Sequence, residues 1–140
     1  MRENAVRVMI VEDDNLVALE LKGRLEAMGY QVAAAATSAP EAVDTAATVK
    51  PDVVLLDIRL GEGLDGIDAA VAIKGRFGVP VVFVTAHSDR ETLARAGLVE
   101  PAWYVLKPIR DYDLQAAIDA AVAPPVNRHP PPCEVLRVRA

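Results

Sequence analysis

The sequence predicts a doubly wound α/β fold, in which five parallel strands form one sheet with helices on both faces. Strand-like apolar runs alternate with stretches of helical periodicity at intervals of roughly 25 residues, and this pattern implies parallel pairing through right-handed crossovers. The run Val53–Leu56 is continuously apolar, as expected of a central strand that is covered on both faces. Five such units fit the strand order 2-1-3-4-5 and are too few for an eight-stranded barrel.

The first half of the chain contains three of the expected strands and two of the helices. The strands are runs of apolar and β-branched residues, at Val6–Val11, Gln31–Ala35 and Asp52–Asp57. Polar residues after the first strand can accept hydrogen bonds from the first turn of a helix at Asn15–Met28, and Gly29 can end this helix in a left-handed conformation. The second helix begins at the capping-box spacing of Ser38 and Glu41 and ends before Pro51.

The second half of the chain contains the other two strands and three helices. The strands are expected at Pro80–Thr85 and Trp103–Leu106, and the third helix at Gly66–Phe77. The spacing of Ser88 and Glu91 is again that of a capping box, and it opens a fourth helix. Asp111 is expected to cap the last helix, whose apolar stripe includes Leu114 and Ile118.

Composition and charge narrow the functional classes. The 140 residues are 52% hydrophobic and 25% charged, which is typical of one domain with a real core. The apolar runs are strand-length, well below the roughly 20 residues that span a bilayer. The net charge of -5 disfavours nucleic acid as a direct partner and favours a protein. There is no secretory signal pattern and Cys133 is the only cysteine, so a cytoplasmic location is expected.

Polar side chains follow four of the expected strands. They are Glu12 and Asp13 after the first strand, Asp57 at the end of the third, Thr85 at the end of the fourth and Lys107 after the fifth. The carboxyl ends of parallel strands meet at one edge of a sheet, where ligands bind in such folds. Carboxylates that converge there repel one another unless a cation shares the site. We therefore expect Mg²⁺, bound directly by Asp13 and Asp57 and through water by Glu12.

The same residues suggest phosphoryl chemistry at Asp57. A carboxylate can act as a nucleophile and form an aspartyl phosphate, a transfer that needs mainly positioning and charge neutralisation. Lys107 and the metal could supply the neutralisation, and Thr85 could donate a hydrogen bond to a phosphoryl oxygen. Each residue alone has an ordinary explanation, such as a helix-capping acid for Asp13 or a solvated lysine for Lys107. Their joint placement at four strand ends favours the functional interpretation.

Four segments resemble the signature blocks of bacterial two-component response-regulator receiver domains, and the resemblance covers about residues 5–123. They are Val8–Asp14, Val54–Asp57, Val82–Ala86 and Tyr104–Pro108. The resemblance implies the flavodoxin-like, or CheY-like, form of the sheet. It also implies a stand-alone receiver that a sensor histidine kinase phosphorylates on Asp57, with no enzymatic activity beyond its own phosphorylation and dephosphorylation.

The resemblance assigns a role to each site residue. Glu12, Asp13 and Asp57 would bind Mg²⁺ together with the backbone carbonyl of Arg59. Thr85 and Lys107 would contact the phosphoryl group, and Tyr104 would be the rotameric switch aromatic. Phosphorylation would then change the surface of the fourth helix, the fifth strand and the fifth helix, which a downstream protein target or a phosphotransfer protein would bind.

The sequence departs from the family pattern at two places. The loop Arg59–Gly66 is longer than the common form and lacks its usual proline, so its geometry is open and Arg59 could tune phosphoryl lifetime. Val99–Ala102 replaces a small, Gly-rich turn, so we expect the fourth helix to be short or distorted. His87 follows Thr85 closely, but a surface histidine is a better interpretation than a phosphate carrier.

Residues 124–140 follow the receiver, taken as residues 1–123, and begin with a proline-rich stretch that favours extended backbone. They fit either a disordered tail or an arm that forms a homodimer, as in some small regulators that partner phytochrome kinases. Other functions also stay open: a phosphorylation-independent scaffold and a phosphorelay intermediate. An aspartate-nucleophile phosphatase is disfavoured, because Arg59 stands where such enzymes commonly carry a second acid.

Overall fold

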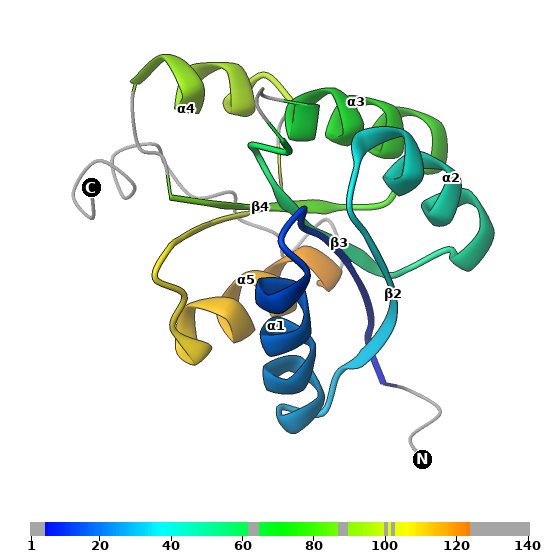
Figure 1. Cartoon of the computed structure of the whole chain (residues 1–140), viewed down its shortest axis with the longest axis vertical. Helices are drawn as coiled ribbons and strands as arrows, with labels where there is room; N and C mark the ends of the chain where they lie inside the picture. Colours follow the sequence, from blue (N-terminus) through cyan, green and yellow to red (C-terminus); the bar gives the residue numbers. More distant parts are fainter. Residues whose placement is uncertain (1–4, 62–64, 87–89, 100, 102, 124–140) are drawn as a thin grey trace.

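The predicted sheet is confirmed in strand number, direction and order. A computed structural model describes residues 5–61, 65–86, 90–99, 101 and 103–123. Within these residues five parallel strands form one sheet in the order β2-β1-β3-β4-β5 (Figure 1). The strands are β1 (Arg7–Val11), β2 (Gln31–Ala36), β3 (Val53–Asp57), β4 (Val81–Thr85) and β5 (Trp103–Leu106). The helices are α1 (Asn15–Ala27), α2 (Ala39–Val49), α3 (Asp65–Phe77), α4 (Arg90–Gly97) and α5 (Asp111–Val122).

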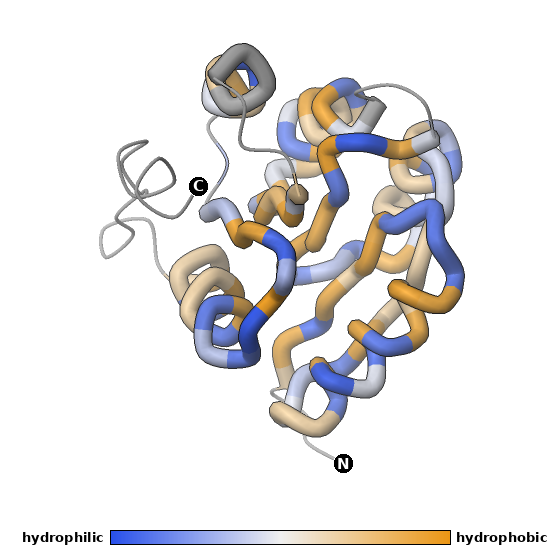
Figure 2. Tube along the Cα trace, turned by 60° about the vertical axis from the view of Figure 1, so that its left-hand side comes forward, coloured by the Kyte–Doolittle hydropathy of each residue, from blue (hydrophilic) through white to orange (hydrophobic). Residues whose placement is uncertain are grey.

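Helices cover both faces of the sheet, as a doubly wound fold requires. α1 and α5 lie on one face, and α2, α3 and α4 lie on the other (Figure 1). Every residue of β3 and β4 is buried, because these strands carry apolar side chains toward both layers. The sheet therefore divides the core into two apolar clusters, one around Phe83 and Ile73 and one around Leu55 and Ile118. Figure 2 shows that the helices carry both hydrophobic and hydrophilic residues.

The register of the central strands aligns the ends that carry the candidate site. Asp57 of β3 lies opposite Val84 of β4, and Thr85 lies opposite Leu106 of β5. The backbone N–H of Lys107 donates to the Thr85 carbonyl at 2.9 Å, so pairing continues one residue beyond β5. The ends of these strands are consequently held in register by main-chain hydrogen bonds.

The predicted helix starts are confirmed in part. Asp14 caps α1, with its side chain accepting from the N–H groups of Leu16 and Val17. Ser38 caps α2 by accepting from the Glu41 N–H at 3.3 Å, but the Glu41 carboxylate accepts from the Thr37 N–H and not from Ser38. The capping box is therefore only half formed, because the acid reaches one residue further back.

The predicted cap of α5 is wrong. Asp111 is the first residue of the helix, and Arg110 occupies the capping position without a side-chain hydrogen bond. The Asp111 carboxylate instead accepts from Arg24 of α1 at 2.8 Å, so a contact between helices replaces the local cap.

The predicted turn at Gly29 and the short fourth helix are confirmed. Gly29 has a φ of 95° directly after α1, in the left-handed region that glycine tolerates best. α4 has 8 residues. Ser88, His87 and the tail 124–140 lie outside the described residues, as do residues 62–64 of the loop before α3. Among the described helices, none combines the length and apolar character that a bilayer-crossing segment needs.

Candidate functional site

Three carboxylates meet at the carboxyl edge of the sheet, as the strand ends predict. Glu12 and Asp13 follow β1, and Asp57 is the last residue of β3. One carboxylate oxygen from each lies within 4.8 Å of the others. Glu12 and Asp57 are buried, whereas Asp13 is exposed at the mouth of the site. Asp13 is thus the member of the cluster that solvent reaches most readily.

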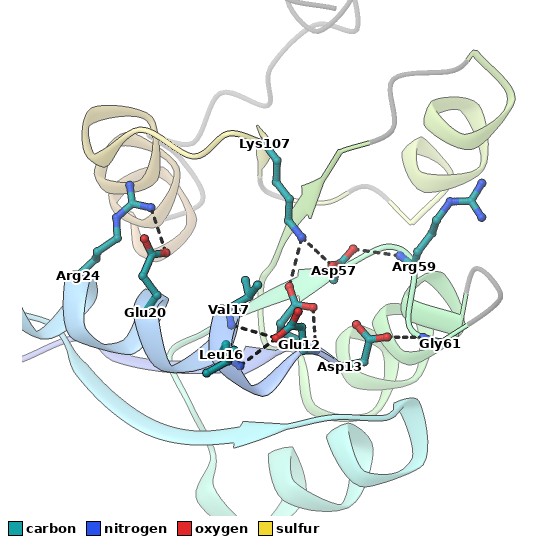
Figure 3. Close-up of polar contacts among 11 residues, drawn as sticks. Glu12, Asp13, Leu16, Val17, Glu20, Arg24, Asp57, Arg59, Gly61 and Lys107 are labelled. Carbon is teal, nitrogen blue, oxygen red and sulfur yellow. Dashed lines mark hydrogen bonds and ion pairs between the residues drawn. The ribbon is translucent and has the colours of Figure 1, made fainter.

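Lys107 reaches into the cluster from the end of β5. Its ammonium donates to Glu12 Oε1 at 3.2 Å and to Asp57 Oδ2 at 3.0 Å (Figure 3). The backbone of Lys107 is fixed by its hydrogen bond to Thr85, so the side chain alone covers the distance from the end of β5 to the carboxylates. The lysine therefore bridges the two buried carboxylates and neutralises part of their charge.

The electrostatics of the site follow from burial and crowding. Burial raises the pKa of Glu12, and the nearby charge of Asp57 adds to this, although the Asp14 N–H and Lys107 oppose it. Burial alone would lower the pKa of Lys107, but its hydrogen bond and charge attraction to Asp57, helped by Glu12, outweigh burial and raise it. Lys107 accordingly stays an ammonium in the site at neutral pH.

The loop after β3 binds the acids through its backbone. The N–H of Arg59 donates to Asp57 Oδ1 at 3.1 Å, and the N–H of Gly61 donates to Asp13 Oδ2 at 2.8 Å (Figure 3). The Gly61 bond is the main reason that the pKa of Asp13 lies below its ordinary value. Sequence reasoning missed this contact, although a glycine beside the acceptor strand is a signal for special backbone geometry, and Gly61 has a φ of 68°.

The N-terminus of α3 packs directly on the backbone at the end of β3, the strand that carries Asp57. The Gly66 N–H donates to the Ile58 carbonyl at 3.0 Å. A Cβ at Gly66 would lie 2.7 Å from the Ile58 carbonyl oxygen and closer still to the carbonyl oxygen of Asp57. Only glycine allows the start of α3 to come this close to the backbone after β3, so Gly66 fixes the position of the helix start.

Thr85 and Tyr104 belong to β4 and β5, which follow β3 in the order of the sheet. Thr85 is fully buried at the end of β4. Tyr104 is 8% exposed, and its ring centroid lies 6.3 Å from that of Phe83 in the layer between the sheet and α4. A Cβ at Gly97 of α4 would lie 3.4 Å from the Tyr104 hydroxyl, so the end of this side chain reaches α4. Tyr104 is thus positioned between the strand that carries Thr85 and the helix above it.

The donor set fits a hard divalent cation. Carboxylate oxygens are the ligands that Mg²⁺ prefers, and it is commonly bound through one or two carboxylates with water and phosphate oxygens completing the shell. Glu12, Asp13 and Asp57 supply such oxygens at the required closeness. Next to the acids, the N–H of Arg59 donates to Asp57, and within the part of the chain that the structure describes the buried Nε of Arg59 has no hydrogen-bond partner. A metal could therefore be held here by the acids that the sequence indicated.

Comparisons with known proteins agree with this geometry. The profile of the response regulator receiver domain matches residues 8–119. The chain is 38% identical over 117 residues to the transcriptional regulatory protein PdtaR of Mycobacterium tuberculosis, covering 84% of this chain and 57% of that regulator. It is 34% identical over 119 residues to the phyllosphere-induced regulator PhyR of Methylorubrum extorquens, covering 84% of this chain and 44% of PhyR. The chain thus spans about half the length of these curated relatives.

A solved structure extends the similarity to three dimensions. The signal receiver domain of a modulated diguanylate cyclase from Desulfovibrio desulfuricans G20 has a TM-score of 0.79 and 31% sequence identity to the chain. The match covers 98% of this chain and 100% of that one. The fold of this chain is therefore similar to that of a solved signal receiver domain.

Proposed function

Because the chain belongs to the response regulator receiver domain family, we propose that it accepts a phosphoryl group on Asp57 and signals through the change in conformation that follows. The observation that carries the proposal is the position of Asp57. It ends the central strand, lies within 4.8 Å of two further carboxylates, and receives the Lys107 ammonium at 3.0 Å. A carboxylate in this setting is surrounded by the charges that phosphoryl transfer needs.

The proposed reaction is a transfer from a phosphohistidine of a sensor histidine kinase. An oxygen of the Asp57 carboxylate attacks the phosphorus, so an O–P bond forms while the P–N bond to the histidine breaks. The departing imidazole takes up a proton from solvent and leaves as a neutral ring. Lys107 can follow the new phosphoryl oxygens, because its flexible side chain already contacts Asp57.

We assign metal binding to the same edge of the site. Asp13 and Asp57 would bind Mg²⁺ directly, Glu12 would bind it through water, and the Arg59 carbonyl would complete the protein ligands. When bound, the ion supplies positive charge that offsets both the carboxylates and the phosphoryl oxygens. Asp13 holds Gly61 with only one of its two carboxylate oxygens, which leaves the other oxygen for the metal.

Signalling would involve Thr85 and Tyr104. A phosphoryl group adds close to two negative charges and strong acceptor oxygens, which would attract the Thr85 hydroxyl and the Lys107 ammonium. Tyr104 would respond to the space that Thr85 leaves, and its hydroxyl, which lies where a Cβ at Gly97 would be 3.4 Å away, would pass the change to α4. The surface of α4, β5 and α5 would then bind a downstream protein or a phosphotransfer protein.

The proposal extends to partners and to the tail. The kinase would bind over the mouth of the site, where Leu16 and Leu19 of α1 are 78% and 65% exposed. We also propose that residues 124–140 form an arm outside the receiver domain 1–123, and that this arm supports a homodimer. Light scattering of the whole chain and of a version ending at Ala123 tests the arm. If both proteins contain the same number of subunits in solution, the proposal is refuted.

Intact mass after incubation with acetyl phosphate tests the proposed reaction. The wild type should gain one phosphoryl group in the presence of Mg²⁺ and none in a chelator, and Asp57→Asn should gain none. Asp44→Asn is the matched control, because Asp44 is an exposed acid on α2 that does not belong to the acidic cluster, and this variant should be phosphorylated normally. A phosphoryl group on Asp57→Asn would refute the assignment. No gain in any protein would favour the phosphorylation-independent scaffold.

A further inference from the structure

We propose that Arg24 of α1 is a positioning residue for Lys107, because it fixes the segment between β5 and α5 that carries this lysine. The inference rests on the proposed function, since Lys107 is there a phosphoryl-contacting residue. The Arg24 side chain is 23% exposed, lies 3.8 Å from the carboxylate of Glu20 one turn earlier, and is not part of the acidic cluster. Its guanidinium reaches across to the segment that follows Lys107 in the chain.

The contacts of Arg24 converge on two residues of that segment. Its Nη2 donates to the Ile109 carbonyl at 2.8 Å, two residues after Lys107. Its Nε donates to Asp111 Oδ1 at 2.8 Å, and its Nη2 lies 2.6 Å from the same oxygen. One planar guanidinium thus holds a backbone carbonyl and the first side chain of α5 in a fixed relation.

The backbone needs support after Lys107 because the chain turns there, between the end of β5 and the start of α5. On the other side, the N–H of Lys107 is bound to the Thr85 carbonyl, which fixes the end of β5. After Lys107 the chain leaves the sheet, and α5 begins at Asp111 without a side-chain hydrogen bond from its capping residue, Arg110. Among the described contacts, the hydrogen bonds of Arg24 are the ones that tie this turn to another helix.

The same helix also starts at the acids that Lys107 contacts. Asp14 caps α1 directly after Asp13, and the buried Leu21 and Leu25 hold the helix against the sheet. α1 is therefore one rigid element that begins at the acidic cluster and, through Arg24, holds the turn behind the lysine. The distance between the Lys107 ammonium and its two carboxylate partners depends on both ends of this element.

Burial favours the hydrogen bond to the carbonyl over the ion pair as the positioning contact. The Arg24 side chain is 23% exposed and the Asp111 side chain is 65% exposed, so solvent screens the ion pair. The bond to the Ile109 carbonyl is partly buried and directional. Arg24→Lys keeps the charge but lacks the planar fork, so it should restore the positioning only in part.

The first test observes Lys107 directly, in protein labelled with nitrogen-15. The chain has four lysines, and only Lys107 donates to two carboxylates among the described contacts. Its ammonium should give a resolved, slowly exchanging NMR signal in the wild type at constant pH. We expect this signal to broaden or shift toward those of exposed lysines in Arg24→Ala, and to recover partly in Arg24→Lys. Arg110→Ala is the matched control, because it removes an ion pair with Asp113 at the same helix start, and the Arg110 side chain is itself 77% exposed.

The second test measures the rate of phosphorylation by acetyl phosphate in a double-mutant cycle. A misplacement of about 1 Å can cost about a hundredfold in rate, so we expect roughly a tenfold loss for Arg24→Ala from a partial displacement. In a Lys107→Ala background the same substitution should cost less than about twofold, because its effect passes through the lysine. Urea unfolding of each variant, measured in parallel, identifies any loss of fold.

The outcomes separate the inference from the function on which it rests. An unchanged Lys107 signal in Arg24→Ala, or no protected Lys107 signal in the wild type, overturns the positioning role. Equal rate losses with and without Lys107 also overturn it and leave Arg24 as a stabilising residue only. A wild type that is not phosphorylated, but whose Lys107 signal depends on Arg24, refutes the proposed function and retains the structural link.

Discussion

Replacing Gly66 by alanine should disturb the end of β3, because the added methyl group has no room there. The added Cβ would lie 2.7 Å and 2.8 Å from the carbonyl oxygen and Cα of Ile58, and closer to the carbonyl oxygen of Asp57. Ordinary contacts between such atoms begin near about 3.5 Å. The helix and the strand must therefore separate by at least about 0.8 Å relative to the Ile58 carbonyl oxygen, and backbone atoms on both sides resist this movement.

The expected loss of stability follows from three effects. Overpacking costs about 1–3 kcal/mol. Stretching the hydrogen bond from the Gly66 N–H to the Ile58 carbonyl costs about 1 kcal/mol more. Alanine regains about 0.5–1 kcal/mol through its lower backbone entropy when unfolded. The sum is about 1–3.5 kcal/mol of destabilisation, which should lower the midpoint of urea unfolding by about 1 M.

Gly75→Ala is the matched control for this measurement. Gly75 lies in the same helix, and a Cβ there would meet nothing within 4 Å. This variant should gain about 0.5–1 kcal/mol, the usual effect of alanine over glycine inside a helix. A Gly66→Ala protein that unfolds at the same urea concentration as the wild type, or as Gly75→Ala, would refute the argument from close backbone approach.

Three further predictions concern charge. The folded state binds the proton of Glu12 more tightly than the unfolded state, because burial raises its pKa above the ordinary value of 4.5. With a chelator present, the free energy of unfolding should therefore fall as pH rises above 4.5. Urea unfolding should show a smaller pH dependence for Glu12→Gln than for the wild type, and an equal pH dependence of the two proteins contradicts this prediction. Lys107→Met should be stabilised by Mg²⁺ more than the wild type is, since the lysine no longer competes for Asp57, and an equal shift of the urea midpoint contradicts this. Burial, and then Asp119, raise the pKa of Tyr30 to about 12, so absorbance titration should show a late tyrosinate step that Tyr30→Phe removes.

Much of the fold could be predicted because its elements are specified locally. The apolar runs of β3 and β4 are buried on both faces, and the turn residue Gly29 ends its helix where expected. The acids and Lys107 converge because parallel strands bring their carboxyl ends to one edge, so the site also follows from the order of elements. Periodicity and position were sufficient for these features.

The contacts that refine the site could not be predicted, because they join residues far apart in sequence. Asp111 has the position of a helix cap, but Arg24, 87 residues away, takes its carboxylate. Likewise, the Gly61 N–H reaches Asp13 across 48 residues. Local spacing cannot say which of two partners a polar side chain will choose when packing brings a distant group nearer.

The brevity of α4 has a consequence for where the domain opens most easily. Of its described side chains only Ala96 is buried, and a helix of about two turns is not stable without packing. After the helix, Val99 is 9% exposed and its carbonyl accepts from the Lys74 ammonium at 2.7 Å. Amide hydrogen exchange should therefore be faster in α4 than in α1 or α5, through local opening that leaves the sheet intact. A helix that detaches at small free-energy cost can change its position in response to a small change in the residues that it packs on, while the sheet and the other helices keep their structure.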